Sequence, residues 1–192
     1  MPAAGDEAEF AAGRADLFSI ENQKPVREFD ILAFSLSFEN DYPDILKMLE
    51  LAGVPLLAID RSEDYPLVIG GGIAATINPE PIAGFFDMFI LGEAEGDLPE
   101  FARIFEETRR LGLARRDLLL RLQKSLRHAY VPAFYEVKYS ADSKIAAFEA
   151  VMPGLPERIR IKPLRDINAF GTEEVISSPQ TEMADMHLVE VN

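Results

Sequence analysis

Three glycines that directly follow a short apolar run, at residues 67–72, constrain the fold of this chain more than any other feature. Glycine has no Cβ atom, so a ligand or a second backbone can approach such a segment closely. In open α/β sheets, ligands bind in the crevice outside the carboxyl ends of the strands. The run therefore predicts a parallel strand whose end borders a crevice beside Gly71 and Gly72.

Two further predicted strands end in small or acidic residues. The apolar run at 30–36 is followed by Ser37, and the run at 88–91 leads through Gly92 to Glu93. Near-continuous apolar runs of this length are typical of strands that are covered on both faces, as in a parallel sheet. We therefore expect these strand ends to face the same crevice as the glycines.

Helices are predicted between and after these strands. Asp41 is an expected N-cap, and apolar residues then recur at helical spacing until Gly53 ends the helix. Asn78 with Pro79 predicts a short helix that begins at Asn78, and residues 97–100 resemble a capping box. Helices are thus predicted near residues 41–52, 78–86, 97–111 and 118–126.

Beyond residue 131 the apolar pattern changes to alternation. Residues 134–139 and 145–151 flank a turn at 141–143, which predicts an antiparallel hairpin. Residues 158–162 and 187–191 are predicted as further strands, 168–185 as a polar loop, and 7–15 as a weakly amphipathic helix.

The predicted fold class is α/β. Residues 1–130 are expected to form an incomplete flavodoxin-like or Rossmann-like parallel sheet flanked by helices. Residues 131–192 are expected to form a small antiparallel β appendage and a linker. With 192 residues, 48% of them hydrophobic, the chain can bury one core.

Charge and composition exclude several classes of partner. The formal net charge is −14, from 33 acidic and 19 basic residues, which argues against nucleic acid or an anionic membrane surface. The chain has no cysteine, so it contains no disulfide, thiolate metal site or cysteine nucleophile. The first residues lack the pattern of a signal peptide, and no apolar run has membrane-spanning length, so the expected location is the cytoplasm.

Isolated motifs each have a simpler explanation than a catalytic site. Residues 70–75 fit the dinucleotide pattern G-x-G-x-x-A, but that site needs a helix immediately after the glycines, whereas the predicted helix begins at Asn78. Glu93 and Glu95 are more simply solvated acids than acid–base or metal-binding groups. His128 and His187 belong to no ligand motif and are expected to be surface or strand residues.

Five segments together resemble one protein family: residues 34–39, 51–56, 67–72, 78–81 and 92–95. They are similar to the radical S-adenosylmethionine (radical SAM) proteins that carry an N-terminal cobalamin-binding-like domain. The resemblance covers most of residues 17–192, and the Asn-Pro-Glu-Pro run at 78–81 is its most specific part.

This resemblance implies that the chemistry lies outside the chain. In that family, the segment similar to residues 186–191 is followed by a Cys-x3-Cys-x2-Cys motif, which holds a 4Fe–4S cluster and leaves one iron free for S-adenosylmethionine. The chain is therefore expected to stop just before that motif, with residues 188–191 as the start of a catalytic barrel. The expected partner is this C-terminal radical SAM barrel, and its cofactors are S-adenosylmethionine and the cluster.

The same resemblance implies a degenerate cobalamin-like site. The family motif Asp-x-His-x-x-Gly, whose histidine binds cobalt, has no match in this sequence. An earlier strand–helix–strand unit of the family is expected to lie upstream of Met1. We therefore expect this chain not to bind cobalamin. The residues that match cofactor-lining positions, or that join them at the crevice, are Ser35, Ser37, Gly71, Gly72 and Glu93.

The expected function is that of a non-catalytic accessory domain, which covers or positions a ligand over the barrel. Two alternatives remain open from the sequence. One is an independent enzyme domain that binds a small molecule or nucleotide around Ser37, Gly71 and Glu93. The other is an assembly module that forms a homodimer through exposed apolar faces.

Overall fold

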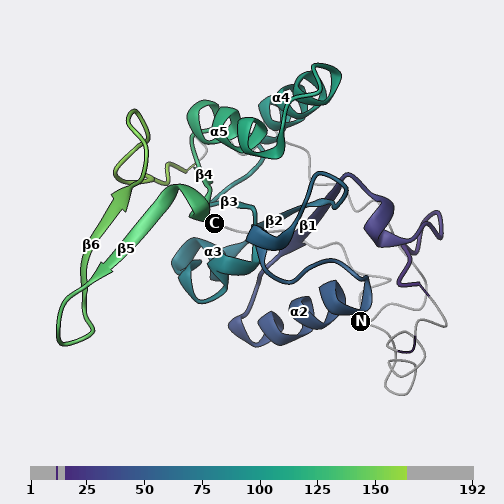
Figure 1. Cartoon of the computed structure of the whole chain (residues 1–192), viewed down its shortest axis with the longest axis horizontal. Coiled ribbons are helices and arrows are strands. Elements are labelled where there is room, and N and C mark those ends of the chain that lie inside the picture. The colour runs from purple at the N-terminus through teal and green to yellow at the C-terminus, as the bar shows by residue number, and fades with distance from the viewer. Residues whose placement is uncertain (1–11, 13–15, 164–192) are drawn as a thin grey trace.

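The computed structural model describes Ala12 and residues 16–163, and within them the predicted α/β fold is confirmed (Figure 1). The main sheet has the strand order β1-β2-β3-β4. The first three strands are parallel, and β4 pairs antiparallel with β3. These strands are β1 (Ile31–Ser35), β2 (Leu67–Gly71), β3 (Met88–Ile90) and β4 (Ala129–Tyr130).

Helices cover both faces of this sheet. In Figure 1, α2 lies on one side of the strands, and α4 and α5 lie on the other. The central strand β3 is fully buried, and β2 is buried except for its last residue, which explains their continuous apolar sequences. The helices are α2 (Tyr42–Leu51), α3 (Ile73–Ile77), α4 (Leu98–Arg110) and α5 (Arg115–Ser125). Short 3₁₀ turns occur at η1 (Val26–Glu28), η2 (Glu39–Asp41), η3 (Ala58–Asp60), η4 (Glu80–Phe85) and η5 (Pro132–Phe134).

The predicted helix start at Asn78 is wrong. Helix α3 begins at Ile73, directly after the glycines, and ends before Asn78. Asn78 instead stabilises the next turn, because its Oδ1 accepts a hydrogen bond from the Glu80 backbone N–H at 3.2 Å. The segment after it is the 3₁₀ turn η4 rather than an α-helix.

The predicted side-chain caps at Asp41 and Asp97 are also wrong. Each occupies an N-cap position, but neither carboxylate accepts a hydrogen bond from its own helix. Asp41 instead accepts a hydrogen bond from the Phe38 backbone N–H at 3.2 Å, and Phe38 precedes the helix. Asp97 is buried and accepts the backbone N–H groups of Arg127 and His128, both at 3.2 Å. Its carboxylate therefore joins the start of α4 to the segment before β4.

The predicted hairpin is confirmed as β5 (Tyr135–Tyr139) and β6 (Ile145–Ala150), a separate two-stranded sheet that projects from the body (Figure 1). Its base packs on the body through aromatic rings. Tyr135 and Phe148 stack on each other with ring centroids 4.9 Å apart, and Tyr130 of β4 lies tilted against both. A two-stranded hairpin is marginal by itself in water, so this packing stabilises it.

The strand predicted at 158–162 is wrong, because this segment has no strand pairing. Residues 155–162, which we call the strap, instead run from the hairpin back to the body. Leu155 is buried in the core, and the Tyr135 hydroxyl donates a hydrogen bond to the Pro156 carbonyl at 3.0 Å. The predictions for residues 7–11, 13–15, 168–185 and 187–191 lie outside the described residues.

A buried ion pair joins the loop before β2, which contains Arg61, to the amino ends of β2 and β3. Arg61 donates from Nη1 to Asp87 at 2.9 Å, and its other donors reach three backbone carbonyls. Asp87 also accepts the Val68 backbone N–H at 2.7 Å. Burial lowers the pKa of Arg61, and the nearby charge of Asp87 opposes that change.

Glu80, within the Asn-Pro-Glu-Pro run, has a structural partner. The buried Tyr130 hydroxyl donates a hydrogen bond to Glu80 Oε1 at 2.5 Å, which ties η4 to β4. Burial first, and then this bond, raise the pKa of Tyr130, so the phenol keeps its proton.

We expect Tyr130→Phe to lower the free energy of unfolding by about 1–2 kcal/mol, because a hydrogen bond to a charged group is lost. The measurement is urea denaturation followed by circular dichroism. Tyr139→Phe is the matched control, since Tyr139 is 65% exposed, and we expect it to change stability by less than about 0.5 kcal/mol. Equal effects of the two substitutions would contradict a stabilising role for the Glu80 contact.

Within residues 16–163, no helix combines the length and apolar character needed to cross a membrane.

Candidate functional site

The carboxyl ends of the three parallel strands border a hollow of about 300 Å³, at the edge where the sequence predicts a crevice. Most of its lining is apolar. Helix α4 contributes Leu98, and the loop after β3 contributes Ala94. The remaining lining residues are Ala33, Phe34, Ser35, Ile69, Gly70, Gly71, Gly72 and Ile90.

The hollow brings together three of the five residues predicted for the site. Ser35, Gly71 and Gly72 line it, and the Ser35 side chain is exposed. Ser37 is exposed just beyond β1, and Glu93 is half-buried in the loop after β3, but neither lines the hollow. The strand ends therefore meet at one edge, while the side chains at those ends are spread around it.

The turn after β2 is locked against the end of β1. Leu36 donates its backbone N–H to the Gly71 carbonyl at 2.8 Å, and its own carbonyl accepts the Ala74 N–H at 3.0 Å. Gly72 has φ +93°, and a Cβ placed there would lie 2.7 Å from the Leu36 oxygen. The third glycine is therefore required for backbone packing, whether or not a ligand binds.

Thr76, which is not among the residues predicted for the site, holds this turn to the next strand end. Its hydroxyl donates to the Gly72 carbonyl at 2.8 Å and accepts the Gly92 N–H at 2.8 Å. A threonine four residues after a carbonyl can form the first bond within one helical turn, and that spacing is visible in sequence. Gly92 is 16 residues away along the chain, so only the folded arrangement shows the second bond.

Within the described residues, this edge supplies no histidine for the cobalt of cobalamin. In the direction of a Cβ atom the glycines approach protein backbone, because a Cβ on Gly71 would lie 3.3 Å from the Ile90 oxygen and one on Gly72 would overlap Leu36. His128 is 5% exposed, and its Nε2 accepts the Lys162 backbone N–H at 3.2 Å. Within the described part of the chain, no imidazole is therefore directed into the hollow.

The hollow also lacks the features of a phosphate site. None of the residues that line it is basic. Helix α3 does begin directly after the glycines, contrary to the prediction, but it has five residues and its Ala74 N–H is already bonded to Leu36. Within residues 16–163, no three metal-ligating side chains come together. The hollow is therefore suited to apolar groups.

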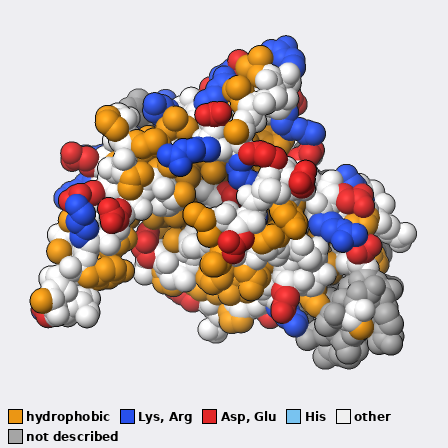
Figure 2. Space-filling model, in the orientation of Figure 1, with side chains coloured by type: hydrophobic (Ala, Val, Ile, Leu, Met, Phe, Trp, Pro, Cys, Tyr) orange, Lys and Arg blue, Asp and Glu red, His pale blue; other side chains and the backbone are white. Residues whose placement is uncertain are grey.

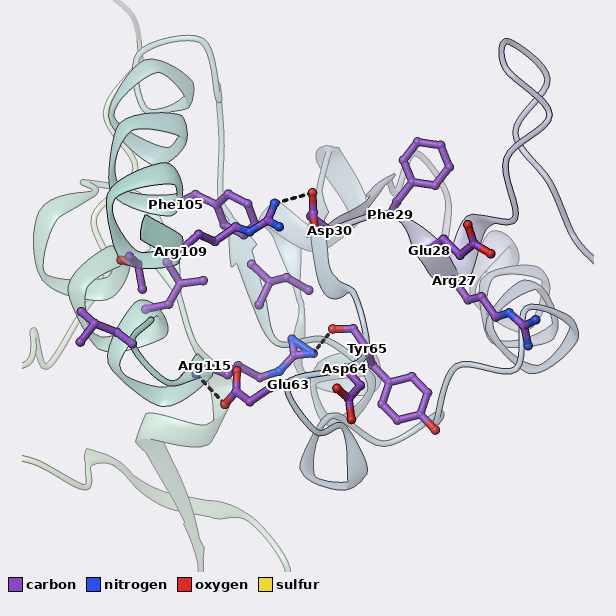
Figure 3. Close-up of a pocket in the computed structure, with 14 residues that line it drawn as sticks. Arg27, Glu28, Phe29, Asp30, Glu63, Asp64, Tyr65, Phe105, Arg109 and Arg115 are labelled. Atoms are coloured by element: carbon purple, nitrogen blue, oxygen red, sulfur yellow. Dashed lines mark hydrogen bonds and ion pairs between the residues drawn. The ribbon is translucent and has the colours of Figure 1, made fainter. Parts of the chain in front are cut away.

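A second hollow, of about 250 Å³, lies at the opposite, amino edge of the sheet (Figure 3). Figure 3 shows Arg109 directed toward Asp30, at 2.6 Å, and Arg115 beside Tyr65, whose carbonyl accepts a hydrogen bond at 3.0 Å. The Arg115 backbone N–H also donates to Glu63 at 2.8 Å. Arg109 and Asp30 pair with each other, while Arg115 and Glu63 are held by backbone groups, so the hollow is a polar junction between the helices and the sheet.

Exposed apolar side chains follow the carboxyl ends of the parallel strands. Phe38, after β1, is 67% exposed, and Ile73 and Ile77 on α3 are 59% and 71% exposed. Leu98, at the start of α4, is 46% exposed. Figure 2 shows hydrophobic side chains gathered over the middle of the face where Figure 1 places α3. Clustered apolar exposure of this kind marks interaction surfaces more often than scattered residues do.

The strap ends at this same edge. Ile161 lies over Gly92, so closely that a Cβ on Gly92 would be 2.7 Å from Ile161 Cγ2. The next residue, Lys162, is fastened to His128. The strap therefore brings the chain from the hairpin to the end of β3.

Comparisons with known proteins identify the family of the chain. The family model described as "Radical SAM proteins, N-terminal" matches residues 1–132. The uncharacterised protein MJ0966 of Methanocaldococcus jannaschii is 31% identical over 80 residues, which are 42% of this chain and 16% of that relative. No solved structure matches the chain significantly. Because the family model covers more than half of the chain, the chain belongs to the family of radical SAM protein N-terminal domains.

Proposed function

We propose that this chain is a non-catalytic accessory domain whose carboxyl edge packs against the radical SAM barrel of a longer protein and helps to enclose a ligand there. The observation that carries the proposal is the course of the strap, which delivers the chain to the edge that exposes Phe38, Ile73 and Ile77. The last described residues therefore lie beside this apolar surface, and a following domain that packs there would remove those side chains from water.

In this proposal the barrel supplies the redox chemistry. The chain has no cysteine, so a 4Fe–4S cluster and the S-adenosylmethionine bound to it belong to the rest of the protein. The accessory domain contributes an apolar wall, formed by the hollow between β1, β2 and β3. A degenerate cobalamin-like domain fits this role, because its glycines serve backbone packing and its hollow keeps an apolar lining.

The two alternatives have less support. An independent nucleotide-binding enzyme would need cations or a longer helix at the hollow, and its lining residues include no lysine or arginine. A homodimer would bury the same apolar edge that the strap leads to. Light scattering on the parent protein tests this alternative, because it separates a dimer from a monomer whose edge packs within its own chain.

We expect Ile77→Asp to weaken the packing of this edge on the barrel without unfolding the domain, because the side chain is 71% exposed. The measurement is amide hydrogen exchange of α3 in the parent protein and in the 192-residue chain. The barrel should protect α3 in the wild type, and the buried charge should reduce that protection by more than about tenfold.

Ile59→Asp is the matched control for Ile77→Asp. Ile59 is 89% exposed and lies in η3, before β2, on the opposite edge of the sheet. We expect this substitution to leave the protection of α3 unchanged. If α3 exchanges equally fast in the parent protein and in the isolated chain, the carboxyl edge does not meet the barrel and the proposal fails.

A further inference from the structure

We propose that His128 is a pH-sensitive latch, which holds the end of the strap while its imidazole is neutral and releases it when the imidazole takes up a proton. The strap links this domain to whatever follows Lys162, so the latch would control the position of the following chain. This inference rests on the contacts of the strap itself and does not require that the carboxyl edge meets a barrel.

The contacts of the ring define its protonation state when the strap is bound. The Lys162 backbone N–H donates to His128 Nε2 at 3.2 Å, so Nε2 is an acceptor and the ring proton is on Nδ1. Nδ1 lies 3.0 Å from Asp97 Oδ2 but is out of line for a directed hydrogen bond. Asp97 therefore acts on the ring mainly through its charge.

Proton uptake conflicts with the bound strap. A second proton can only go to Nε2, which would then place an N–H donor against the N–H donor of Lys162. His128 is 5% exposed, so water does not resolve this conflict while the strap stays in place. If the end of the strap leaves, Nε2–H can reach water, and the Asp97 carboxylate stabilises the imidazolium.

The charged groups around the ring favour this coupling. Asp97 faces the ring from the start of α4, and its carboxylate is fixed by the backbone N–H groups of Arg127 and His128, so it stays when the strap leaves. Arg127 beside the ring and Arg160 and Lys162 on the strap all have exposed side chains. Arg160 and Lys162 leave with the strap, Arg127 stays on the body, and all three are exposed to water, so Asp97 is the charge that acts on the buried ring.

The release should be local. The beginning of the strap keeps its own attachments, since Leu155 is in the core and the Pro156 carbonyl accepts a hydrogen bond from Tyr135. At the other end of the strap, Ile161 is 43% exposed. It contacts Gly92 through its apolar side chain. We therefore expect residues 160–162 to detach, while Leu155 remains buried and the partly buried Ile159 keeps its contact with the core.

The test combines amide hydrogen exchange with ¹⁵N NMR of the imidazole on the 192-residue chain, from about pH 7.5 to about pH 5.5. After correction for the intrinsic exchange rate, protection of the Lys162 amide should fall about tenfold per pH unit as the ring takes up one proton. The NMR spectrum should show protonation of His128 over the same range, and protection of α4 should stay constant.

His128→Gln is the matched variant, because its side-chain carbonyl can accept the Lys162 N–H at any pH while its amide faces Asp97. We expect the strap of this variant to stay protected across the whole range. Three results would overturn the proposal: a protonated ring with a protected strap, a ring that does not titrate while the domain is folded, or the same pH dependence in the glutamine variant.

Discussion

Gly72→Ala is expected to lower the free energy of unfolding by about 3–5 kcal/mol, from backbone strain at positive φ together with steric overlap. The residue has φ +93°, and its new Cβ would lie 2.7 Å from the oxygen and 2.9 Å from the nitrogen of Leu36. Those atoms belong to backbone that is bonded to Gly71 and Ala74, so they cannot move aside without breaking the joint between β1 and β2. Denaturant unfolding measures the loss.

Gly53→Ala separates the two causes of this effect. Gly53 has φ +67°, close to the left-handed region, but a Cβ there would meet no atom within 4 Å. The alanine variant should therefore lose only the conformational part, about 1–2 kcal/mol. If Gly72→Ala lowers the free energy of unfolding by no more than Gly53→Ala does, the close approach of Gly72 to Leu36 does not contribute to stability.

Asp87→Ala is the second substitution with a large expected effect, about 3–5 kcal/mol of unfolding free energy. It leaves the Arg61 guanidinium, whose side chain is 0% exposed, without its carboxylate and removes the acceptor for the Val68 N–H. A buried cation without a partner is far more costly than the net value of the pair itself. Arg115 is 3.7 Å from the same carboxylate, so two cations would then face each other.

The control for Asp87→Ala is Glu100→Ala on α4. Glu100 pairs with Arg103 at 2.7 Å, on the surface, where water solvates both groups when the pair is broken. We expect little change in stability from this variant. A small effect of Asp87→Ala would mean that water or another acceptor reaches Arg61, contrary to its burial.

The sheet could be predicted because the sequence patterns that indicate its strands lie within the strands and directly after them. Continuous apolar runs and the glycines that follow them identify β1, β2 and β3, and alternation identifies the hairpin. Helix α3 was missed because its residues carry no capping signal, while Asn78 and Pro79 carry one that serves a 3₁₀ turn. The two-residue strand β4 is too short to leave a pattern.

The candidate site was only partly predictable, for a related reason. Ser35 and the glycines could be placed because strand ends meet at one edge of a parallel sheet. Asp97 was given the wrong role because sequence shows the helix that follows it but not the backbone of residues 127–128, 30 positions later. His128 was expected to be a surface or strand residue, and its burial follows from packing between Asp97 and the strap.

The position of β1 in the strand order determines where the sheet can grow. Asp30 and Leu36 direct their backbone bonds toward β2, so in a parallel ladder the amides of Ile31, Ala33 and Ser35 point the opposite way. On that side no strand of the described residues is paired with β1, whereas the opposite edge of the sheet is the two-residue antiparallel strand β4. Strand addition at β1 can therefore enlarge the domain while the crevice between β1, β2 and β3 keeps its walls.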